Sequence, residues 1–154
     1  MDITFKKDFV ERYTNLTDFK EFKEISLKPL PRTIRVNTLK SDVDEIKKRL
    51  KDWNLTELGF YDNGFVIEHK RKERRDIGNL KEHFLGYFYV QEAASMLPPL
   101  VLNPNKNDIV LDMAAAPGSK TTQIAAMMEN KGLIVANEYR YDRLKPLSIN
   151  LQRC

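Results

Sequence analysis

Residues 108–122 read DIVLDMAAAPGSKTT, and this stretch decides the fold of the chain. A short apolar run ends at Asp112 and leads through small residues and Pro117-Gly118 into a helical pattern. A strand that delivers the chain in this way to the start of a helix leaves backbone N–H groups free to face a ligand. Because alanine and glycine carry almost no side chain, a bound molecule can lie against the backbone of residues 114–118. The stretch therefore predicts a ligand site at the start of a helix near Ser119.

A second apolar run, residues 133–136, precedes Glu138, which lies 26 residues after Asp112. This order is that of a strand–loop–helix–strand unit with an acidic residue at the end of its second strand. It is the layout of a Rossmann-type nucleoside site, where the acidic residue binds the ribose hydroxyls. The predicted fold class is therefore α/β, with the start of a Rossmann-type parallel sheet in the second half of the chain.

Two common nucleotide sites do not fit the spacing. A phosphate loop needs glycine directly before the lysine, but Ser119 separates Gly118 from Lys120. The three spaced glycines of a dinucleotide site are also missing. A nucleoside with a small polar tail remains, and S-adenosylmethionine fits this description: its amino-acid end would meet the loop N–H groups and its ribose would meet Glu138.

The first half of the chain predicts a small α+β module over residues 1–75. Its helical and strand-like patterns are joined by a hairpin turn predicted at Asp62-Asn63-Gly64. Helices are expected at 6–13 and 43–53, and a further helix is expected to begin after the cap Thr17-Asp18. Strands are expected at 32–39, 55–60 and 65–68.

Residues 76–154 are expected to form the first, truncated part of a Rossmann-type domain. Strands are predicted at 108–112 and 132–137, and helices at 91–102, 119–128 and 141–152, with Pro98 and Pro99 ending or kinking the first helix. Two parallel strands would leave apolar sheet surface uncovered, because parallel strands are normally buried on both faces. We therefore expect further strands downstream.

Composition limits the classes of protein and of site. The apolar fraction is 42% and no run is long enough to span a bilayer. The N-terminus lacks the apolar core of a signal peptide, so we expect a cytoplasmic protein with no membrane partner. Cys154 is the one cysteine, and His69 and His83 have no ligand partners at metal spacing, so we expect no disulfide and no metal. The net charge of +4 permits a polyanionic partner.

Residues 112–121, DMAAAPGSKT, resemble motif I of the Nop/Sun family of RNA cytosine-5 methyltransferases. Three other stretches agree with the family in order and spacing: PRTIRVNT at 31–38, YVQEAAS at 89–95, and ANE at 136–138 followed by Arg143 and by NLQR at 150–153. The resemblance implies an enzyme that uses S-adenosylmethionine to form 5-methylcytosine in RNA. It implies cofactor contacts by Ala114, Ala115, Ala116, Pro117, Gly118, Ser119, Lys120, Glu138 and Arg143.

The family's chemistry needs a nucleophilic cysteine, because carbon 5 of cytosine becomes nucleophilic only after a thiolate adds to carbon 6. In the family this cysteine lies in a Thr-Cys-Ser motif, and a second cysteine lies in Asp-Ala-Pro-Cys. Cys154 is outside either motif. We therefore expect no catalytic residue in this chain, a nucleophile supplied downstream by the rest of the methyltransferase domain, and no activity from this stretch alone.

RNA contact is predicted for a set of basic residues, and the compact N-terminal module favours tRNA over rRNA as the partner. The run 70–75 also fits an ordinary solvated surface. The set is Arg32, Arg35, Lys70, Arg71, Lys72, Arg74 and Arg75. The aromatic residues Phe84, Tyr87, Phe88 and Tyr89 are interpreted as core rather than as base-stacking surfaces.

Two alternatives remain. The first is a methyltransferase of a small molecule, which would bind S-adenosylmethionine and have no affinity for RNA. The second is a non-catalytic RNA-binding module, which would bind RNA and ignore the cofactor.

Overall fold

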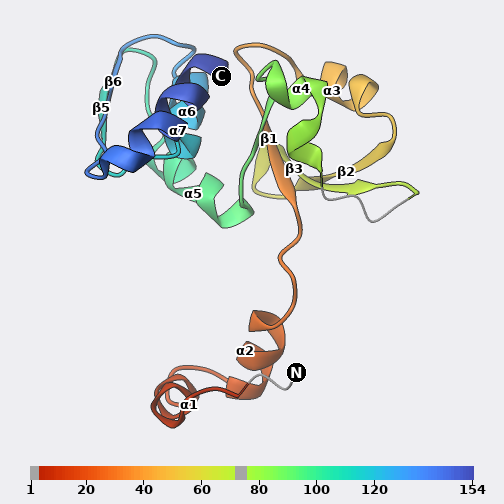
Figure 1. Ribbon diagram of the computed structural model, residues 1–154, viewed down its shortest axis with the longest axis vertical. Coiled ribbons are helices and arrows are strands. Elements are labelled where there is room, and N and C mark those ends of the chain that lie inside the picture. The colour runs from red at the N-terminus through yellow and green to blue at the C-terminus, as the bar shows by residue number, and fades with distance from the viewer. Residues whose placement is uncertain (1–3, 72–75) are drawn as a thin grey trace. The chain divides into compact units, whose positions relative to one another are not determined.

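The computed structural model describes residues 4–71 and 76–154 (Figure 1). Lys72, Arg74 and Arg75, three of the residues predicted to contact RNA, lie outside these ranges. The chain divides into two compact units, Met1–Leu30 and Pro31–Cys154. The boundary predicted at residue 75 therefore falls inside the second unit.

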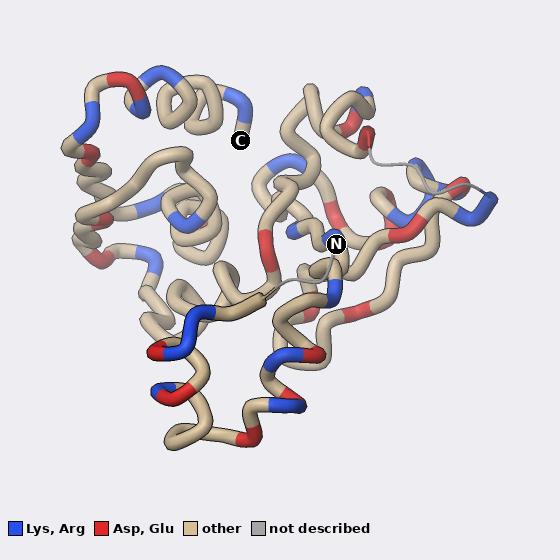
Figure 2. Tube along the Cα trace, turned by 60° about the horizontal axis from the view of Figure 1, so that its bottom comes forward, with Lys and Arg blue, Asp and Glu red and all other residues tan. Residues whose placement is uncertain are grey.

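The first unit is a pair of short helices, α1 (Lys7–Thr14) and α2 (Phe19–Ser26), and both carry acidic as well as basic residues (Figure 2). Asp18 caps α2, since its carboxylate accepts the N–H of Lys20 at 2.8 Å. Aromatic rings join the helices, with the Tyr13 ring 4.6 Å from that of Phe22. Isolated helices of this length are marginal in water, so this aromatic packing stabilises the pair.

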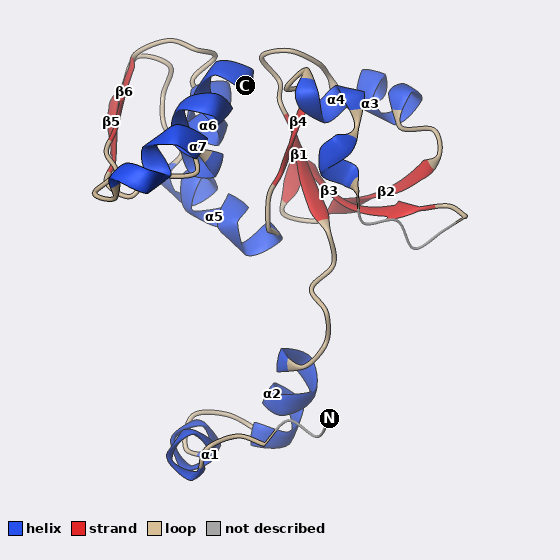
Figure 3. Ribbon diagram, in the orientation of Figure 1, coloured by secondary structure: helices blue, strands red, loops and turns tan. Residues whose placement is uncertain are grey.

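The second unit begins with a four-stranded antiparallel sheet in the order β2-β3-β1-β4 (Figure 3). Its core consists of side chains from the strands and from α3 and η1: Ile34, Val36, Ile46, Leu50, Trp53, Phe65, Ile67, Ile77 and Phe88. The elements are β1 (Thr33–Val36), α3 (Val43–Arg49), β2 (Trp53–Leu58), β3 (Tyr61–His69), η1 (Ile77–Asn79), α4 (Lys81–Phe84) and β4 (Phe88–Val90).

The hairpin between β2 and β3 turns at Gly59-Phe60, and the turn predicted at Asp62-Asn63-Gly64 is wrong. These three residues lie inside β3, where Gly64 is paired with Arg35. A Cβ on Gly64 would lie 2.9 Å from the Leu58 side chain. Gly64 therefore lies at a closely packed position of the strand rather than in a turn.

β4 was not predicted as a strand, and it places residues after 75 in the first sheet. Val36 of β1 is paired with Phe88 of β4, and Phe88 has no exposed area. The interpretation of Phe88 and Tyr89 as core is confirmed, whereas Phe84 is 67% exposed. The sheet is thus completed by a strand that follows its partner β1 by some fifty residues in the chain.

The remaining elements form a strand–helix–strand unit followed by a helix, as predicted. β5 and β6 are parallel, with Asp112 paired with Ala136. The elements are α5 (Ala93–Leu102), β5 (Ile109–Asp112), α6 (Ser119–Met127), β6 (Leu133–Ala136) and α7 (Tyr141–Arg153). Figure 1 shows α6 and α7 on one side of the strand pair.

Pro98 and Pro99 do not end α5, which continues to Leu102. Proline lacks the N–H that would bind the carbonyl four residues earlier. Pro99 therefore leaves the carbonyl of Ser95 without its helical donor, and the side-chain Nε2 of Gln91 donates to that oxygen instead, at 3.1 Å. This side-chain donor satisfies one carbonyl in the proline-containing segment.

Candidate functional site

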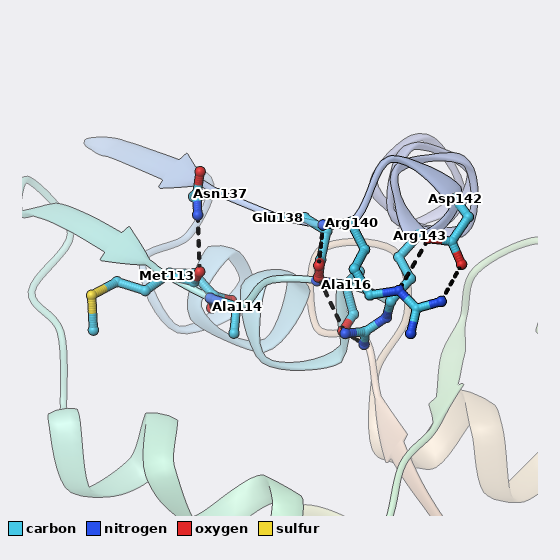
Figure 4. Close-up of polar contacts among 9 residues, drawn as sticks. Met113, Ala114, Ala116, Asn137, Glu138, Arg140, Asp142 and Arg143 are labelled. Atoms are coloured by element: carbon cyan, nitrogen blue, oxygen red, sulfur yellow. Dashed lines mark hydrogen bonds and ion pairs between the residues drawn. The ribbon is translucent and has the colours of Figure 1, made fainter.

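Asn137 fixes the loop that joins β5 to α6 (Figure 4). Its carbonyl accepts the N–H of Ala115 at 2.9 Å, and its side-chain Nδ2 donates to the carbonyl of Met113 at 3.0 Å. Its own N–H donates to the carbonyl of Asp112 at 2.8 Å. The end of β6 is thereby hydrogen-bonded to the small-residue loop on both sides of Ala114.

Asp112 joins the end of β5 to the first turn of α6. One carboxylate oxygen accepts the hydroxyl of Thr121 at 2.7 Å, and the other lies 3.4 Å from the N–H of Ala114. Asp112 therefore links the backbone of the loop to the side chain of Thr121 in the first turn of α6.

Glu138 meets the loop at Ala116 (Figure 4). One carboxylate oxygen accepts the N–H of Ala116 at 3.3 Å and lies 3.4 Å from Arg143 Nη1, while the other accepts the N–H of Arg140 at 3.0 Å. Arg143 Nη2 also donates to the carbonyl of Ala116. Three predicted cofactor residues are thus brought together, with the Glu138 side chain only 4% exposed.

The α6 helix starts at Gly118, whose φ of 102° favours glycine. A Cβ there would also lie 3.2 Å from the Leu147 side chain of α7. α7 holds the loop through Asn150 as well, since its Nδ2 donates to the carbonyl of Pro117 at 2.8 Å. Pro117 follows Ala116 through a cis peptide bond.

The first turn of α6 presents donors without helical acceptors. The N–H groups of Ser119, Lys120 and Thr121 belong to the positions that no preceding turn can satisfy. Ser119 and Lys120 are half-buried. A helix start carries partial positive charge, and the Lys120 ammonium adds a full one. This end of α6 can therefore bind an anionic group.

The basic residues predicted to contact RNA occupy different surroundings. Arg32, Lys70 and Arg71 are exposed, and Lys70 Nζ donates to the carbonyl of Lys51 at 2.7 Å. Arg35 has no exposed area, and its guanidinium donates to the buried side chains of Gln91 and Thr122. This burial corrects the expectation for Arg35, because it leaves no guanidinium surface for an RNA phosphate.

Cys154 follows α7 and is half-buried. Burial raises the pKa of its thiol, and this effect exceeds the opposing influence of Arg153, Arg35 and Lys40. A raised pKa leaves less thiolate at neutral pH, which is unfavourable for a nucleophile.

Within residues 4–71 and 76–154, no group of three or more His, Cys, Asp or Glu is arranged to hold a metal ion. The helices of the same ranges include none long and apolar enough to cross a membrane.

A cavity of about 550 Å³ lies between α6, β6 and the end of α7. Its lining includes Thr121, Thr122, Ala136 and Cys154 but neither Glu138 nor Lys120. Because these two residues do not line the cavity, we do not assign it to the ligand predicted at the loop.

Sequence reasoning missed the polar residues that hold the loop. Asn137, Asn150 and Thr121 all lie within or beside the stretches that resembled the family, but none was given a role. Tyr89 was interpreted only as core, although its hydroxyl accepts Asn150 Nδ2 at 3.1 Å.

Comparison with known proteins gives a consistent result. Residues 5–93 match the family model of the N-terminal domain of 16S rRNA methyltransferase RsmF, and residues 99–154 match that of 16S rRNA methyltransferase RsmB/F. The chain is 52% identical over 130 residues to ribosomal RNA small subunit methyltransferase F of Photobacterium profundum, which covers 82% of this chain and 27% of the relative. It is 44% identical over 155 residues to the tRNA (cytosine(49)-C(5))-methyltransferase of Pyrococcus abyssi, covering 96% of this chain and 47% of the relative.

Solved structures show the same similarity. A methyltransferase homolog protein from Pyrococcus horikoshii matches with a TM-score of 0.78 and 34% identity, over 97% of this chain and 53% of its own. NSun6 from the same organism, solved with SFG, has the same fold, with a TM-score of 0.85 at 23% identity over 97% of this chain and 62% of its own. The chain spans less than half the length of the two curated relatives above.

Proposed function

The chain belongs to the Nop/Sun family of RNA cytosine-5 methyltransferases, and from this membership we propose that the natural protein methylates carbon 5 of a cytosine in RNA. The methyl donor is S-adenosylmethionine. The observation that carries the proposal is the hydrogen bond between the Glu138 carboxylate and the loop of small residues that leads into α6.

The residues present fit this cofactor in their chemistry. Residues 114–118 let a ligand approach the backbone, the start of α6 suits a carboxylate, and Glu138 suits hydroxyl groups. A carboxylate oxygen has two acceptor positions, so the Glu138 oxygen bound to the N–H of Arg140 can accept one hydroxyl more. When bound, S-adenosylmethionine supplies the electrophilic methyl group.

Each residue has a distinct part in the proposal. Glu138 binds the ribose hydroxyls, and the N–H groups of Ser119 and Lys120 face the carboxylate of the cofactor's amino-acid end. Lys120 adds its positive charge there. Arg143 holds the carbonyl of Ala116 and the carboxylate of Glu138, which keeps the wall of the site in place.

The catalytic thiol of the proposed reaction comes from another part of the natural protein. Cys154 is half-buried, and burial raises its pKa. We therefore expect the 154-residue stretch to bind the cofactor without completing the reaction.

We propose that the protein is cytoplasmic and that its RNA substrate is tRNA; the alternative substrate is rRNA. Support comes from the tRNA methyltransferase relative, whose match covers more of both chains than that of the rRNA relative. The cytosine must be accessible or extruded, since stacking hides carbon 6. Arg32, Lys70 and Arg71, with the basic residues up to 75, would bind phosphates and set the salt dependence of affinity.

The first experiment is calorimetric titration of the natural gene product with S-adenosylmethionine. Glu138→Ala should weaken binding by about tenfold to a hundredfold, because a charged acceptor is lost. Asp142→Ala is the matched control: this acid lies in the same region, is 65% exposed and pairs with Arg140. It should leave the dissociation constant nearly unchanged. Equal affinities for Glu138→Ala and wild type would refute the assignment of the site.

The substrate is tested by methyl transfer to purified tRNA and to small-subunit rRNA, with the product nucleoside identified. Formation of 5-methylcytidine in tRNA alone would support the proposal. Formation of 5-methylcytidine in rRNA alone would show that the substrate is rRNA. Cofactor binding without RNA affinity would favour a small-molecule methyltransferase. RNA affinity without cofactor binding would favour a non-catalytic module.

A further inference from the structure

Arg35 is a buried cation whose role the RNA prediction does not explain. It is the largest of the fully buried side chains, with no exposed area. Among residues 4–71 and 76–154 no carboxylate pairs with it, and its Nη1 has no hydrogen-bond partner. Burying a charge without an opposite charge is costly, so a residue kept there for packing alone would be better apolar.

The guanidinium reaches from β1 to the first turn of α6. Its Nε donates to Gln91 Oε1 at 2.9 Å, and its Nη2 donates to the Thr122 hydroxyl at 2.9 Å. Nη2 also lies 3.5 Å from the carbonyl of Ser119. The Tyr89 ring centroid is 5.8 Å from the guanidinium carbon. Arg35 therefore binds the same turn whose N–H groups face the proposed cofactor.

Thr122 carries the contact to the residue that begins α6. Its hydroxyl donates to the carbonyl of Gly118 at 2.8 Å while it accepts from Arg35. Gly118 is the N-cap of α6 and the last residue of the small-residue loop. The Thr122 residue that holds this loop end, through its N–H and its hydroxyl, is itself held by a hydrogen bond from β1.

Gln91 extends the same network into α5 and the middle of α6. Its Nε2 donates to Gln123 Oε1 at 2.9 Å, and Gln123 Nε2 donates to the carbonyl of Met96 at 2.9 Å. Both glutamines are buried, with at most 4% exposed. A buried network of this kind specifies one arrangement of its members, because any shift leaves a polar group unsatisfied.

We propose that Arg35 is a positioning residue for the cofactor loop. It holds Thr122 and, through it, Gly118, and so fixes the N–H groups of Ser119 and Lys120 at the position where the cofactor carboxylate binds. This inference rests on the proposed function in one respect, that the loop binds S-adenosylmethionine. In this proposal Arg35 acts through Thr122 and not through a contact of its own with the cofactor.

The test compares Arg35→Met with Asn37→Ala in the natural gene product. Asn37 is a matched control because it lies two residues away in sequence, is 1% exposed, and donates from Nδ2 to Gly86 and Cys154 carbonyls at 2.9 Å. Like Arg35, Asn37 donates hydrogen bonds to segments that are distant in sequence, but none of these bonds is to α6. Both variants should unfold at lower temperature than wild type.

Two readouts separate positioning from stability. Without cofactor, Arg35→Met should speed amide exchange at Thr122 and Gln123 more than in β3, whereas Asn37→Ala should not single out α6. With cofactor, Arg35→Met should weaken S-adenosylmethionine binding about tenfold, as expected for losing hydrogen bonds from a charged group, and Asn37→Ala should not. Arg35→Lys, which keeps the charge but not the forked donors, should recover part of the affinity.

If Arg35→Met does not fold, Thr122→Val removes the acceptor with little change of shape and should reproduce both effects. The proposal would be overturned if Asn37→Ala changed S-adenosylmethionine affinity and amide exchange in α6 as much as Arg35→Met and Thr122→Val do. A folded Arg35→Met with wild-type affinity and exchange would overturn it as well. If wild type does not bind S-adenosylmethionine, the proposed function fails, and the amide exchange at Thr122 still decides the role of Arg35.

Discussion

The four-stranded sheet and the β5–β6 pair show how differently two sheets in one chain can be buried. In the first sheet, Ile34 and Phe65 are at most 1% exposed. In the second, Ile109 is 77% and Leu111 59% exposed, on residues that alternate along β5. The neighbouring strand repeats the pattern, since Leu133, which pairs with Ile109, is 53% exposed. Strand pattern alone therefore does not determine burial, which depends on the elements that cover each face.

The two sheets also differ in what joins them to the rest of the second unit. The first has an apolar core of its own, whereas its links to α6 and α7 are polar. Asn37 donates to the carbonyl of Cys154, and Lys40 Nζ donates to the carbonyl of Arg153 at 2.8 Å. Hydrogen bonds of this kind are directional, so they fix orientation more than they add stability.

The largest difference is expected from deleting apolar side chains in the two sheets. Phe88→Ala should lower the free energy of unfolding by about 3–5 kcal/mol, because the ring has no exposed area and leaves a cavity. Leu111→Ala should cost less than about 1 kcal/mol in this chain, since Leu111 is already largely exposed. Urea denaturation of both variants measures the difference. Similar losses would mean that the β5–β6 face is covered in solution.

A second test concerns the close approach between Gly86 and the end of α7. Gly86 has a φ of 75°, and a Cβ there would lie 1.8 Å from the carbonyl oxygen of Arg153. Gly86→Ala should cost about 1–3 kcal/mol, since both the backbone conformation and the contact must change. Gly59→Ala is the matched control, because a Cβ at Gly59 meets nothing within 4 Å.

Thermal and urea unfolding followed by circular dichroism give both values. A Gly86→Ala variant as stable as Gly59→Ala would show that the end of α7 is not held against the loop before β4. That result would leave the first sheet intact and remove one of its links to α7.

The sequence predicted the strand–helix–strand unit because each of its elements carries a local signal. The two apolar runs and the small-residue loop between them all lie within residues 108–136. The hairpin turn was misplaced because Asn63-Gly64 has the composition of a turn. In the structure Gly64 lies inside β3, where a Cβ would come close to the Leu58 side chain. β4 was missed because it has three residues and pairs with β1, far away in the chain.

The same distinction explains the site. Glu138 and loop 114–118 could be predicted, since a strand end and a helix start define their positions. Arg35 could not, because arginine is seldom buried and an exposed RNA contact is the ordinary expectation for it. Its partners Gln91 and Thr122 are 56 and 87 residues away in sequence. Only the tertiary structure brings these residues together.

A smaller effect is expected from the bond between Asp112 and Thr121. Thr121→Val should lower the free energy of unfolding by about 1 kcal/mol, because a 2.7 Å hydrogen bond is lost and the shape is kept. Thr56→Val, at an exposed position of β2, is the matched control and should be close to neutral. Urea denaturation measures both, and equal stabilities would show that Asp112 is satisfied by solvent instead.

The smallest expected effect is a pH dependence at the link between α4 and α7. Burial lowers the pKa of His83, and the guanidinium of Arg153 lowers it further. Arg153 Nη1 donates to the His83 carbonyl at 2.7 Å, and the His83 ring lies 5.6 Å from that of Phe88. Below the ordinary histidine pKa of about 6.5, the unfolded chain therefore binds more protons than the folded one.

The sign of the effect follows from this difference. The contribution of neutral His83 to stability is fully present above the unfolded pKa and is lost as the pH falls through that value toward the folded one. His83→Gln should therefore show a shallower fall in urea midpoint between pH 7 and pH 5 than wild type. His69→Gln leaves His83 in place and should keep the wild-type slope. If His83→Gln and wild type had parallel profiles, the acid sensitivity would belong to carboxylates elsewhere, and the link between α4 and α7 would be insensitive to protonation.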